Sequence, residues 1–310
     1  MKILFMGTPD FALFSLRALA ESEHSIVGVV TQPDKPRGRG YALTPPPVKV
    51  FATEKGFPVY QPNTLRGEEF ETLLGELAPD VIVVVAYGKI LPKNVLDYPR
   101  YGCINVHGSL LPEYRGAAPM QRAIIDGKKV TGIITMYMAD GIDTGDMLLK
   151  DEVVIEENDN FEVIHDKLGA CGAALIVKTL AGLEAGEIQR QPQDDALATH
   201  AAKITKEDCL IDWALDARRL HDLIRGLSPI PLAFTHTADG KLLKVIKADI
   251  FKEDGACGQA GEVISVEDGI CVACGKGCLR LLKVLPEGKS RMDACDFVRG
   301  RKVSKGDILR

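Results

Sequence analysis

An amide and an imidazole stand two residues apart in the segment CINVHGSLLPEYRGAAP, residues 103–119. The start of this segment is typical of a strand, and Gly108 and Pro112 end it. Side chains at i and i+2 of a strand share a face, so Asn105 and His107 point the same way at its carboxyl end. Ligand crevices of open α/β sheets form at that end. An Asn N–H can hold a developing oxyanion and a His can exchange a proton near neutral pH, so the pair predicts a catalytic site.

Three carboxylates follow the next predicted strand, in the loop ADGIDTGD at residues 139–146. A carboxylate beside an imidazole orients its ring, but spacing alone does not choose among Asp140, Asp143 and Asp146. The loop lacks the D-x-[DN]-x-[DN]-G pattern of a calcium site. In a purely structural interpretation His107 only satisfies hydrogen bonds at a strand end and the carboxylates cap a turn. The combination of both segments favours catalysis.

Alternating strands and helices must position these residues. Strands are predicted at 2–6, 25–31, 81–86, 102–106 and 131–138, and helices at 11–20, 68–77, 119–125 and 160–181. Thr8 is a predicted N-cap of the first helix. The run at 81–86 has no polar face, as in central parallel strands. The pattern predicts an α/β fold with a doubly wound, mostly parallel, Rossmann-like sheet.

The turn after the first strand is not a nucleotide site. Its sequence, GTPDF, lacks both the G-x-G-x-x-G of dinucleotide-binding turns and the G-x-x-x-x-G-K-[ST] of a P-loop. Pro9 also removes one of the N–H groups that would hold a pyrophosphate.

A second, smaller domain is predicted after a polar stretch. Residues 189–203, QRQPQDDALATHAAK, predict a linker. One helix at 214–227 follows, and then short strands at 242–246, 261–266, 270–273 and 279–284, separated by Gly and Asp turns. This spacing predicts a small β-barrel. We therefore expect a catalytic domain at 1–188, the linker at 189–203 and a barrel domain at 204–310.

Composition excludes several classes of protein. No apolar run approaches the roughly 20 residues of a membrane span, and the apolar start is too short for a signal peptide. We expect a cytoplasmic protein without a membrane partner. Eight cysteines in such a chain predict free thiols. Cys271, Cys274 and Cys278 form one cluster, but a zinc site needs four ligands, so we expect no bound metal.

The net charge of −5 is unevenly spread. Residues 1–200 hold 19 Lys and Arg against 27 Asp and Glu, a net charge of −8. Residues 201–310 hold 19 against 16, a net charge of +3. An acidic chain is not typical of a dedicated nucleic-acid binder, but its second part is mildly basic.

Two motifs identify a family. GCINVHGSLLPEYRGAAP and DGIDTGDML closely resemble the two motifs of the folate-dependent formyltransferases. FMGTPDFA, VVTQPDKPRGRG, TPPPVKVFA and VVVAYGKILP, with ITKEDCLIDW and LIRGLSPIP in the second part, resemble the members that formylate the methionine of initiator tRNA. The resemblance spans nearly the whole chain, and it implies an OB-like C-terminal barrel and a monomer.

The resemblance also implies roles for named residues. Asn105, His107 and Asp143 match the family's catalytic trio, with 10-formyltetrahydrofolate as the formyl donor and no metal. The residues matching the family's folate-binding positions are Ser109, Leu110, Leu111, Pro112 and Ile90. The acceptor would be the α-amino group of initiator methionyl-tRNA, which titrates near about 8 and is partly neutral in the cell. Asn105 and protonated His107 would stabilise the tetrahedral oxyanion, and Asp143 would orient the ring.

A long Pro- and Gly-rich loop at 31–50 matches the family's tRNA-contacting insertion. The resemblance makes Arg39 the matched tRNA contact, with Arg37 and Lys35 beside it. Tyr41 and Ala42 stand where many relatives carry lysines. Elsewhere Ile230 replaces the Trp of the family's N-P-W-P motif. These departures concern tRNA binding and packing and leave the trio intact.

Three other interpretations use the same sequence. A folate-dependent formyltransferase could act on a small amine, such as a sugar nucleotide or glycinamide ribonucleotide. A formyltetrahydrofolate hydrolase would use water as the acceptor. Neither explains the barrel domain or the basic loop. A nucleic-acid-binding protein without catalysis would leave the N-x-H segment and the Asp-rich loop unexplained.

Overall fold

The computed structural model describes residues 1–37, 42–300 and 302–310. They divide into two compact units, each built from several chain segments. The first unit comprises Met1–Gly116, Val130–Val153 and His165–His200, and the second comprises Ala117–Lys129, Val154–Ile164 and Ala201–Arg310. The domain boundaries expected from the sequence, at 188 and 203, stay a prediction.

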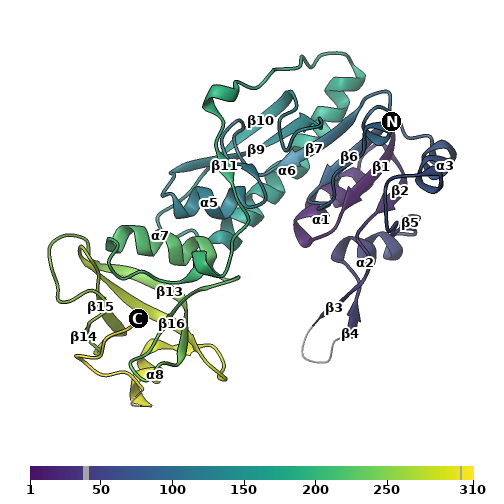
Figure 1. The fold of residues 1–310 in the computed structure, drawn as a ribbon. Coiled ribbons are helices and arrows are strands. Elements are labelled where there is room, and N and C mark those ends of the chain that lie inside the picture. Colours follow the sequence, from purple (N-terminus) through teal and green to yellow (C-terminus); the bar gives the residue numbers. More distant parts are fainter. Residues whose placement is uncertain (38–41, 301) are drawn as a thin grey trace. The chain divides into compact units, whose positions relative to one another are not determined.

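The first unit is built on a seven-stranded sheet with the order β10-β9-β7-β6-β1-β2-β5 (Figure 1). Its strands are β1 Lys2–Gly7, β2 Ser25–Val30, β5 Val59–Tyr60, β6 Val81–Val85, β7 Cys103–His107, β9 Val130–Tyr137 and β10 Met147–Val154. β1 pairs in parallel with β2 and β6, β6 pairs in parallel with β7, and β2 with β5. β7 runs antiparallel to β9. The predicted mostly parallel sheet is confirmed.

Helices cover both faces of this sheet. They are α1 Asp10–Ala20, α2 Pro47–Glu54, α3 Glu68–Leu77, α4 Lys93–Leu96 and α6 Phe161–Glu184. Cys103 of β7 belongs to the same buried cluster as Phe70 of α3. Val106, three residues further along β7, faces the opposite side, where a Cβ on Gly172 of α6 would lie 3.1 Å from it. The sheet is therefore doubly wound, and β7 is buried on both faces.

The predicted N-cap of α1 is wrong. The helix begins at Asp10, and the cap position before it is taken by Pro9, which offers no side-chain hydrogen bond. The hydroxyl of Thr8 instead donates to the carbonyl oxygen of Tyr87 at 3.2 Å. Thr8 thus ties the first turn to the loop after β6.

Short strands that the sequence did not predict complete the architecture. They include β3 Lys35–Arg37, β4 Ala42–Thr44, β8 Arg115–Gly116 and β11 His200–Ala201, and the strands β5 and β10 of the main sheet were not predicted either. β3 and β4 pair in an antiparallel ribbon within the long loop that follows β2.

The second unit holds an antiparallel sheet with the order β12-β13-β16-β15-β14, and β17 pairs with β16. Its elements are α5 Pro119–Ile125, α7 Ala217–Leu227, β12 Ala233–His236, β13 Leu242–Lys252, β14 Val263–Ser265, β15 Ile270–Ala273, β16 Cys278–Pro286, β17 Met292–Asp293 and α8 Ala294–Arg299. Register shifts along β13 and β16 bend the pair. The sheet curls into a half-barrel, which confirms the expected OB-like domain.

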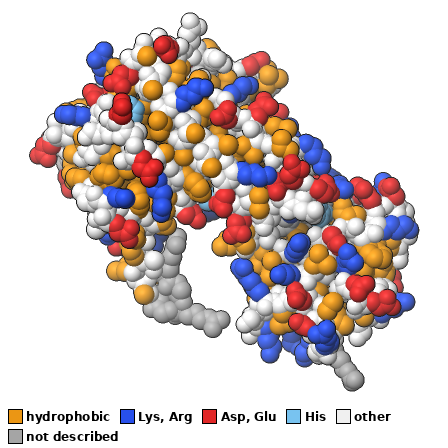
Figure 2. Space-filling model, turned by 180° about the vertical axis from the view of Figure 1, so that it is seen from behind, with side chains coloured by type: hydrophobic (Ala, Val, Ile, Leu, Met, Phe, Trp, Pro, Cys, Tyr) orange, Lys and Arg blue, Asp and Glu red, His pale blue; other side chains and the backbone are white. Residues whose placement is uncertain are grey.

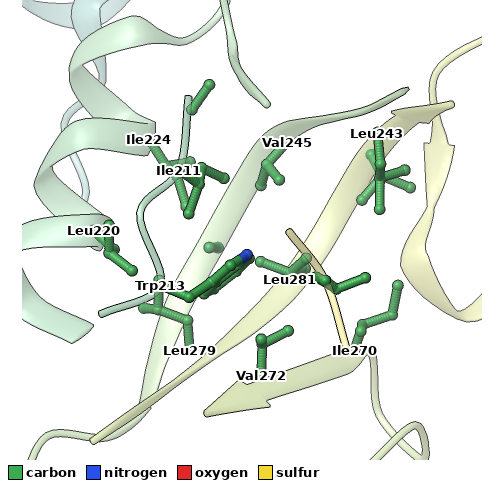
Figure 3. Packing of buried hydrophobic residues seen from close by; sticks show 14 of the residues in the cluster. Ile211, Trp213, Leu220, Ile224, Leu243, Val245, Ile270, Val272, Leu279 and Leu281 are labelled. Carbon is green, nitrogen blue, oxygen red and sulfur yellow. The ribbon is translucent and has the colours of Figure 1, made fainter. Parts of the chain in front are cut away.

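Trp213 occupies the core of this half-barrel. Its side chain is 4% exposed and lies among Val245, Leu279 and Leu281 (Figure 3). The indole N–H donates to the hydroxyl oxygen of Thr235 at 3.0 Å. The large ring therefore fills the core with its one polar atom satisfied.

Within the described ranges, no helix has the length and apolar character to cross a membrane. All eight cysteines are free thiols. Burial raises the pKa of Cys274 and of Cys278 to about 12, so these thiols of the cysteine cluster stay neutral at physiological pH. Among the residues that the structure describes, no group of three or more His, Cys, Asp or Glu side chains is arranged to hold a metal ion.

Candidate active site

Asn105 and His107 lie on β7, near the centre of the sheet. β7 pairs with β6 on one side and with β9 on the other, where Asn105 faces Met136 and His107 faces Ile134. The ring of His107 is 6% exposed, whereas Asn105 is half-buried. Within the described residues, the side-chain amide of Asn105 makes no hydrogen bond to another protein group. Because Asn105 is only half-buried, a ligand can reach this amide. Such an amide can donate to an oxygen atom of a substrate.

The imidazole of His107 has a polar neighbour at each nitrogen. Nε2 lies 3.1 Å from the carbonyl oxygen of Tyr114. Because a carbonyl oxygen only accepts, Nε2 carries a proton in this contact. Nδ1 lies 3.6 Å from Oδ2 of Asp143. A second proton on Nδ1 therefore creates an ion pair with Asp143, and the ring can hold and release that proton beside a carboxylate.

The structure chooses among the three carboxylates that spacing left open. Asp143 lies beside His107, and its Oδ2 also accepts a hydrogen bond from the Gly116 N–H at 2.9 Å. Asp140 is exposed, and Asp146 contributes its carbonyl oxygen to the Tyr137 N–H. Asp143 has a φ of 53°, in the left-handed region, which turns its carboxylate back toward β7.

Cys103 lies on the same strand face as Asn105 and His107 but does not join their chemistry. Its thiol is buried and donates to the carbonyl oxygen of Val95 at 3.4 Å. Burial raises the pKa of Cys103 to about 12, so the thiolate that a nucleophile requires does not form near neutral pH.

The predicted folate-binding positions fall into two groups. The hydroxyl of Ser109 is buried and donates to the carbonyl oxygen of Glu113 at 2.7 Å, and Leu111 packs against Ile134 and Met136. The side chains of Ser109 and Leu111 are buried and already contact other protein groups, so a ligand could meet only the backbone at these two positions. Leu110 and Pro112 are half-buried, and Ile90 is 82% exposed. The folate assignments stay predictions.

Two of the three predicted tRNA contacts lie on the β3–β4 ribbon. Lys35 and Arg37 lie on β3, and the ammonium group of Lys35 donates to the side-chain oxygen of Gln32 at 2.9 Å. Arg39, the matched contact, lies outside the described residues together with Tyr41. Ala42 begins β4. In the second unit, the departing residue Ile230 is 69% exposed.

Sequence analysis missed a residue that contacts the Asp loop. Gln193 donates to the carbonyl oxygens of Asp143 and Gly145, at 2.8 and 2.7 Å. It lies in the polar stretch predicted as a linker, where no hydrophobic period marks any residue. The pattern QPQDD between two predicted domains gives no signal of a contact some fifty residues back along the chain.

Two family models match the chain. The model described as formyl transferase matches residues 1–180. The model described as formyl transferase, C-terminal domain, matches residues 203–302.

Curated relatives match along the full length. The methionyl-tRNA formyltransferase of Geobacter metallireducens is 48% identical over 99% of this chain and 97% of its own length. The methionyl-tRNA formyltransferase of Bacillus subtilis is 49% identical, also over 99% of this chain and 97% of its own length.

Solved structures share the fold. The N-formyltransferase from Helicobacter canadensis, in complex with folinic acid and dTDP-3-aminofucose, has a TM-score of 0.64 at 14% identity and is matched over 91% of this chain and 98% of its own. HypX from Aquifex aeolicus with tetrahydrofolic acid has a TM-score of 0.63 at 16% identity, matched over 96% of this chain and 47% of its own. At such low identity the likeness shows the fold alone. The two family models and the full-length relatives go further, and they show that the chain belongs to the formyl transferase family of enzymes.

Proposed function

We propose that this enzyme transfers the formyl group of 10-formyltetrahydrofolate to the α-amino group of initiator methionyl-tRNA. The observation that carries the proposal is the identity of about half of all residues, over both domains, with methionyl-tRNA formyltransferases. A likeness confined to the first domain would support formyl transfer but not this acceptor.

The cluster around β7 supplies the groups that formyl transfer needs. The neutral amine attacks the formyl carbon, and the carbonyl oxygen becomes an oxyanion. The unengaged amide of Asn105 donates to that oxygen. Protonated His107, paired with Asp143, stabilises the same charge and donates its proton to the folate nitrogen as the carbon–nitrogen bond breaks, and the neutral ring then accepts the proton that the amine loses. The amine loses one proton and the folate nitrogen gains one, so the overall reaction balances.

The described residues fit a folate donor at this edge of the sheet. Asn105 has an amide with no protein partner in the described ranges, as a site for a substrate oxygen requires. Ile90 presents an exposed aliphatic side chain on the loop after β6, the strand next to β7. Such a side chain gains stability by covering an apolar ring. We assign donor binding to Ile90 and the backbone of residues 109–112.

We assign the acceptor tRNA to the basic groups of the chain. Lys35 and Arg37 lie on β3, Arg39 follows two residues later in the sequence, and three such cations can neutralise phosphates. Figure 2 shows Lys and Arg side chains gathered along the lower edge of the second unit, whose residues 201–310 carry a net charge of +3. We also propose that the enzyme acts as a monomer in the cytoplasm, where its tRNA substrate is charged.

A direct assay tests the acceptor. The protein is given labelled 10-formyltetrahydrofolate with charged initiator tRNA, with charged elongator methionine tRNA, with an amino sugar nucleotide or with no acceptor. We expect formyl transfer to initiator methionyl-tRNA at a rate well above all the others. Transfer to the amino sugar nucleotide, or release of formate in the absence of an acceptor, would contradict the proposal.

A further inference from the structure

The segment after α6 is bound along the first unit. The N–H groups of Met147 and Gln191 each donate to the other residue's carbonyl oxygen, at 2.8 and 2.9 Å. The guanidinium group of Arg190 lies 3.9 Å from the ring centroid of Tyr137. Thr199 accepts a hydrogen bond from the N–H of Tyr114 at 2.8 Å. These contacts anchor the segment before and after Gln193.

Gln193 uses all of its hydrogen-bonding capacity. Its side-chain N–H groups donate to the carbonyl oxygens of Asp143 and Gly145, at 2.8 and 2.7 Å. Its side-chain oxygen accepts from Nε and Nη2 of Arg115, at 3.0 and 2.8 Å. A carboxamide has two donors and two lone pairs, so only the side chains of Gln and Asn carry the groups that this arrangement uses. Gln193 therefore joins the Asp-rich loop to Arg115.

Arg115 is itself fixed. It is 5% exposed, and its Nη2 also lies 2.7 Å from the carboxylate of Asp195. Its backbone N–H donates to the carbonyl oxygen of Thr199 at 2.9 Å. The next residue, Gly116, donates its N–H to Oδ2 of Asp143. Residues 115–116 therefore contact Asp143 in two ways. Gly116 binds its carboxylate directly, and Arg115 is linked to its backbone through Gln193.

The Asp-rich loop needs such support. Asp143 lies in the left-handed region at a φ of 53°, which few residues other than Gly adopt. Its neighbours Gly141 and Gly145 have wide conformational freedom in an unsupported loop. A Cβ on Gly145 would lie 1.9 Å from the carbonyl oxygen of Tyr137, so the loop passes too close to β9 for any larger residue. External hydrogen bonds must select the one loop conformation that faces His107.

We propose that Gln193 is a positioning residue for the reaction: it holds the backbone of Asp143 and Gly145 so that the Asp143 carboxylate stays beside His107. This role rests on the proposed function, because it needs Asp143 to act in formyl transfer. Gln193 touches no reacting atom. It acts through Asp143, and Arg115 and Asp195 keep it in place.

The variant Gln193→Glu tests the role. A glutamate keeps the acceptor oxygens for Arg115 but turns an acceptor toward the two loop carbonyl oxygens, which repel it. We expect kcat to fall by about 10- to 100-fold, as a displacement of about 1 Å in a catalytic group causes. KM for 10-formyltetrahydrofolate should stay within about threefold, because the change removes no ground-state contact with the donor. The matched control is Gln189→Glu, an exposed position of the same segment, which should keep the wild-type rate.

A double-mutant cycle separates positioning from general stability. Added to Asp143→Ala, the Gln193→Glu change should lower kcat by less than about twofold further, because the group that Gln193 positions is already gone. An undiminished loss in that background, or a wild-type kcat for Gln193→Glu alone, would overturn the positioning role. Wild-type activity of Asp143→Ala would overturn the catalytic assignment of Asp143 and the positioning role with it. If Gln193→Glu melts below the assay temperature, the uncharged Gln193→Met variant takes its place in the same cycle.

Discussion

The side chains that we propose as catalytic differ in how firmly the protein holds them. His107 is held through Nε2 by Tyr114 and lies beside Asp143, which a backbone N–H of Gly116 supports in turn. Asn105 has no such partner in the described ranges, so its amide is available for a substrate. In the proposed mechanism, the residues that need a fixed geometry are thus bonded to the described part of the protein, and the residue that meets the substrate is not.

Asn105→Ala removes the free amide without disturbing a bond inside the protein. We expect kcat to fall by about 100- to 1,000-fold, the usual effect of deleting one oxyanion donor. The thermal unfolding midpoint should stay close to wild type, because Asn105 is half-buried and its amide is unengaged. Steady-state kinetics and a thermal melt measure the two quantities. A variant that keeps its kcat would show that the oxyanion is stabilised elsewhere.

At the level of elements, the sequence predicted most of the fold. Apolar runs gave the five predicted strands of the first sheet within one or two residues, and α3, α5 and β15 at their observed bounds. Asn105, His107 and the Asp-rich loop came from the same segments, since a strand end and a following loop are local patterns, but only the family resemblance singled out Asp143 among the three carboxylates. Two strands of that sheet, β5 and β10, were not predicted, and neither were contacts between residues far apart in the sequence. Gln193 and Arg115 are 78 residues apart, and Thr8 failed as a cap because Tyr87 offers it a partner 79 residues away.

Helix α7 carries a histidine that the catalytic site does not use. His221 is 3% exposed, and its Nδ1 has no hydrogen-bond partner in the described part of the chain. Burial lowers the pKa of His221 below its ordinary value of 6.5, and Arg225 and Arg218 act in the same direction against Asp222 and Glu157. At a pH just below 6.5, His221 is therefore protonated in the unfolded chain but remains neutral in the folded protein.

This shift makes the second unit lose stability in mild acid. Below pH 6.5 the unfolded state binds a proton that the folded state refuses, so the free energy of unfolding falls as the pH falls through 6.5 toward the folded pKa of His221. His221→Leu should flatten that dependence between about pH 7 and 5. The single tryptophan, Trp213, lies in this unit, so its fluorescence during urea unfolding provides the measurement. The control His200→Leu, at an exposed position, should keep the wild-type slope, and an equal slope in His221→Leu would contradict the explanation.

Across the whole molecule, the uneven distribution of charge fits different roles for the two parts of the chain. The first 200 residues carry a net charge of −8, yet they include the basic loop around β3 and β4. Residues 201–310 carry +3. An acidic protein that presents basic groups locally binds a polyanion at chosen places only, because the remaining surface repels it.

The affinity for tRNA should therefore depend on salt. Between about 50 and 200 mM salt we expect KM for methionyl-tRNA to rise by at least about 40-fold, because the release of counterions from three phosphate contacts alone gives a slope of log KM against log salt close to three. Replacing Lys35, Arg37 and Arg39 by Ala should lower the slope of log KM against log salt by about one for each cation removed. Lys178→Ala, at an exposed position on α6, is the control. An unchanged slope in the triple variant would place the tRNA contacts elsewhere.

The most direct test follows the formyl group itself. Labelled 10-formyltetrahydrofolate and charged initiator tRNA are mixed with excess enzyme for a single turnover, with wild type and with His107→Ala, and the label on the methionine amine and in free formate is counted. We predict that wild type places the label on the methionine amine and that His107→Ala transfers it at least about 100-fold more slowly. Label appearing as formate would contradict the proposed acceptor reaction, and equal transfer by both proteins would contradict the role of His107.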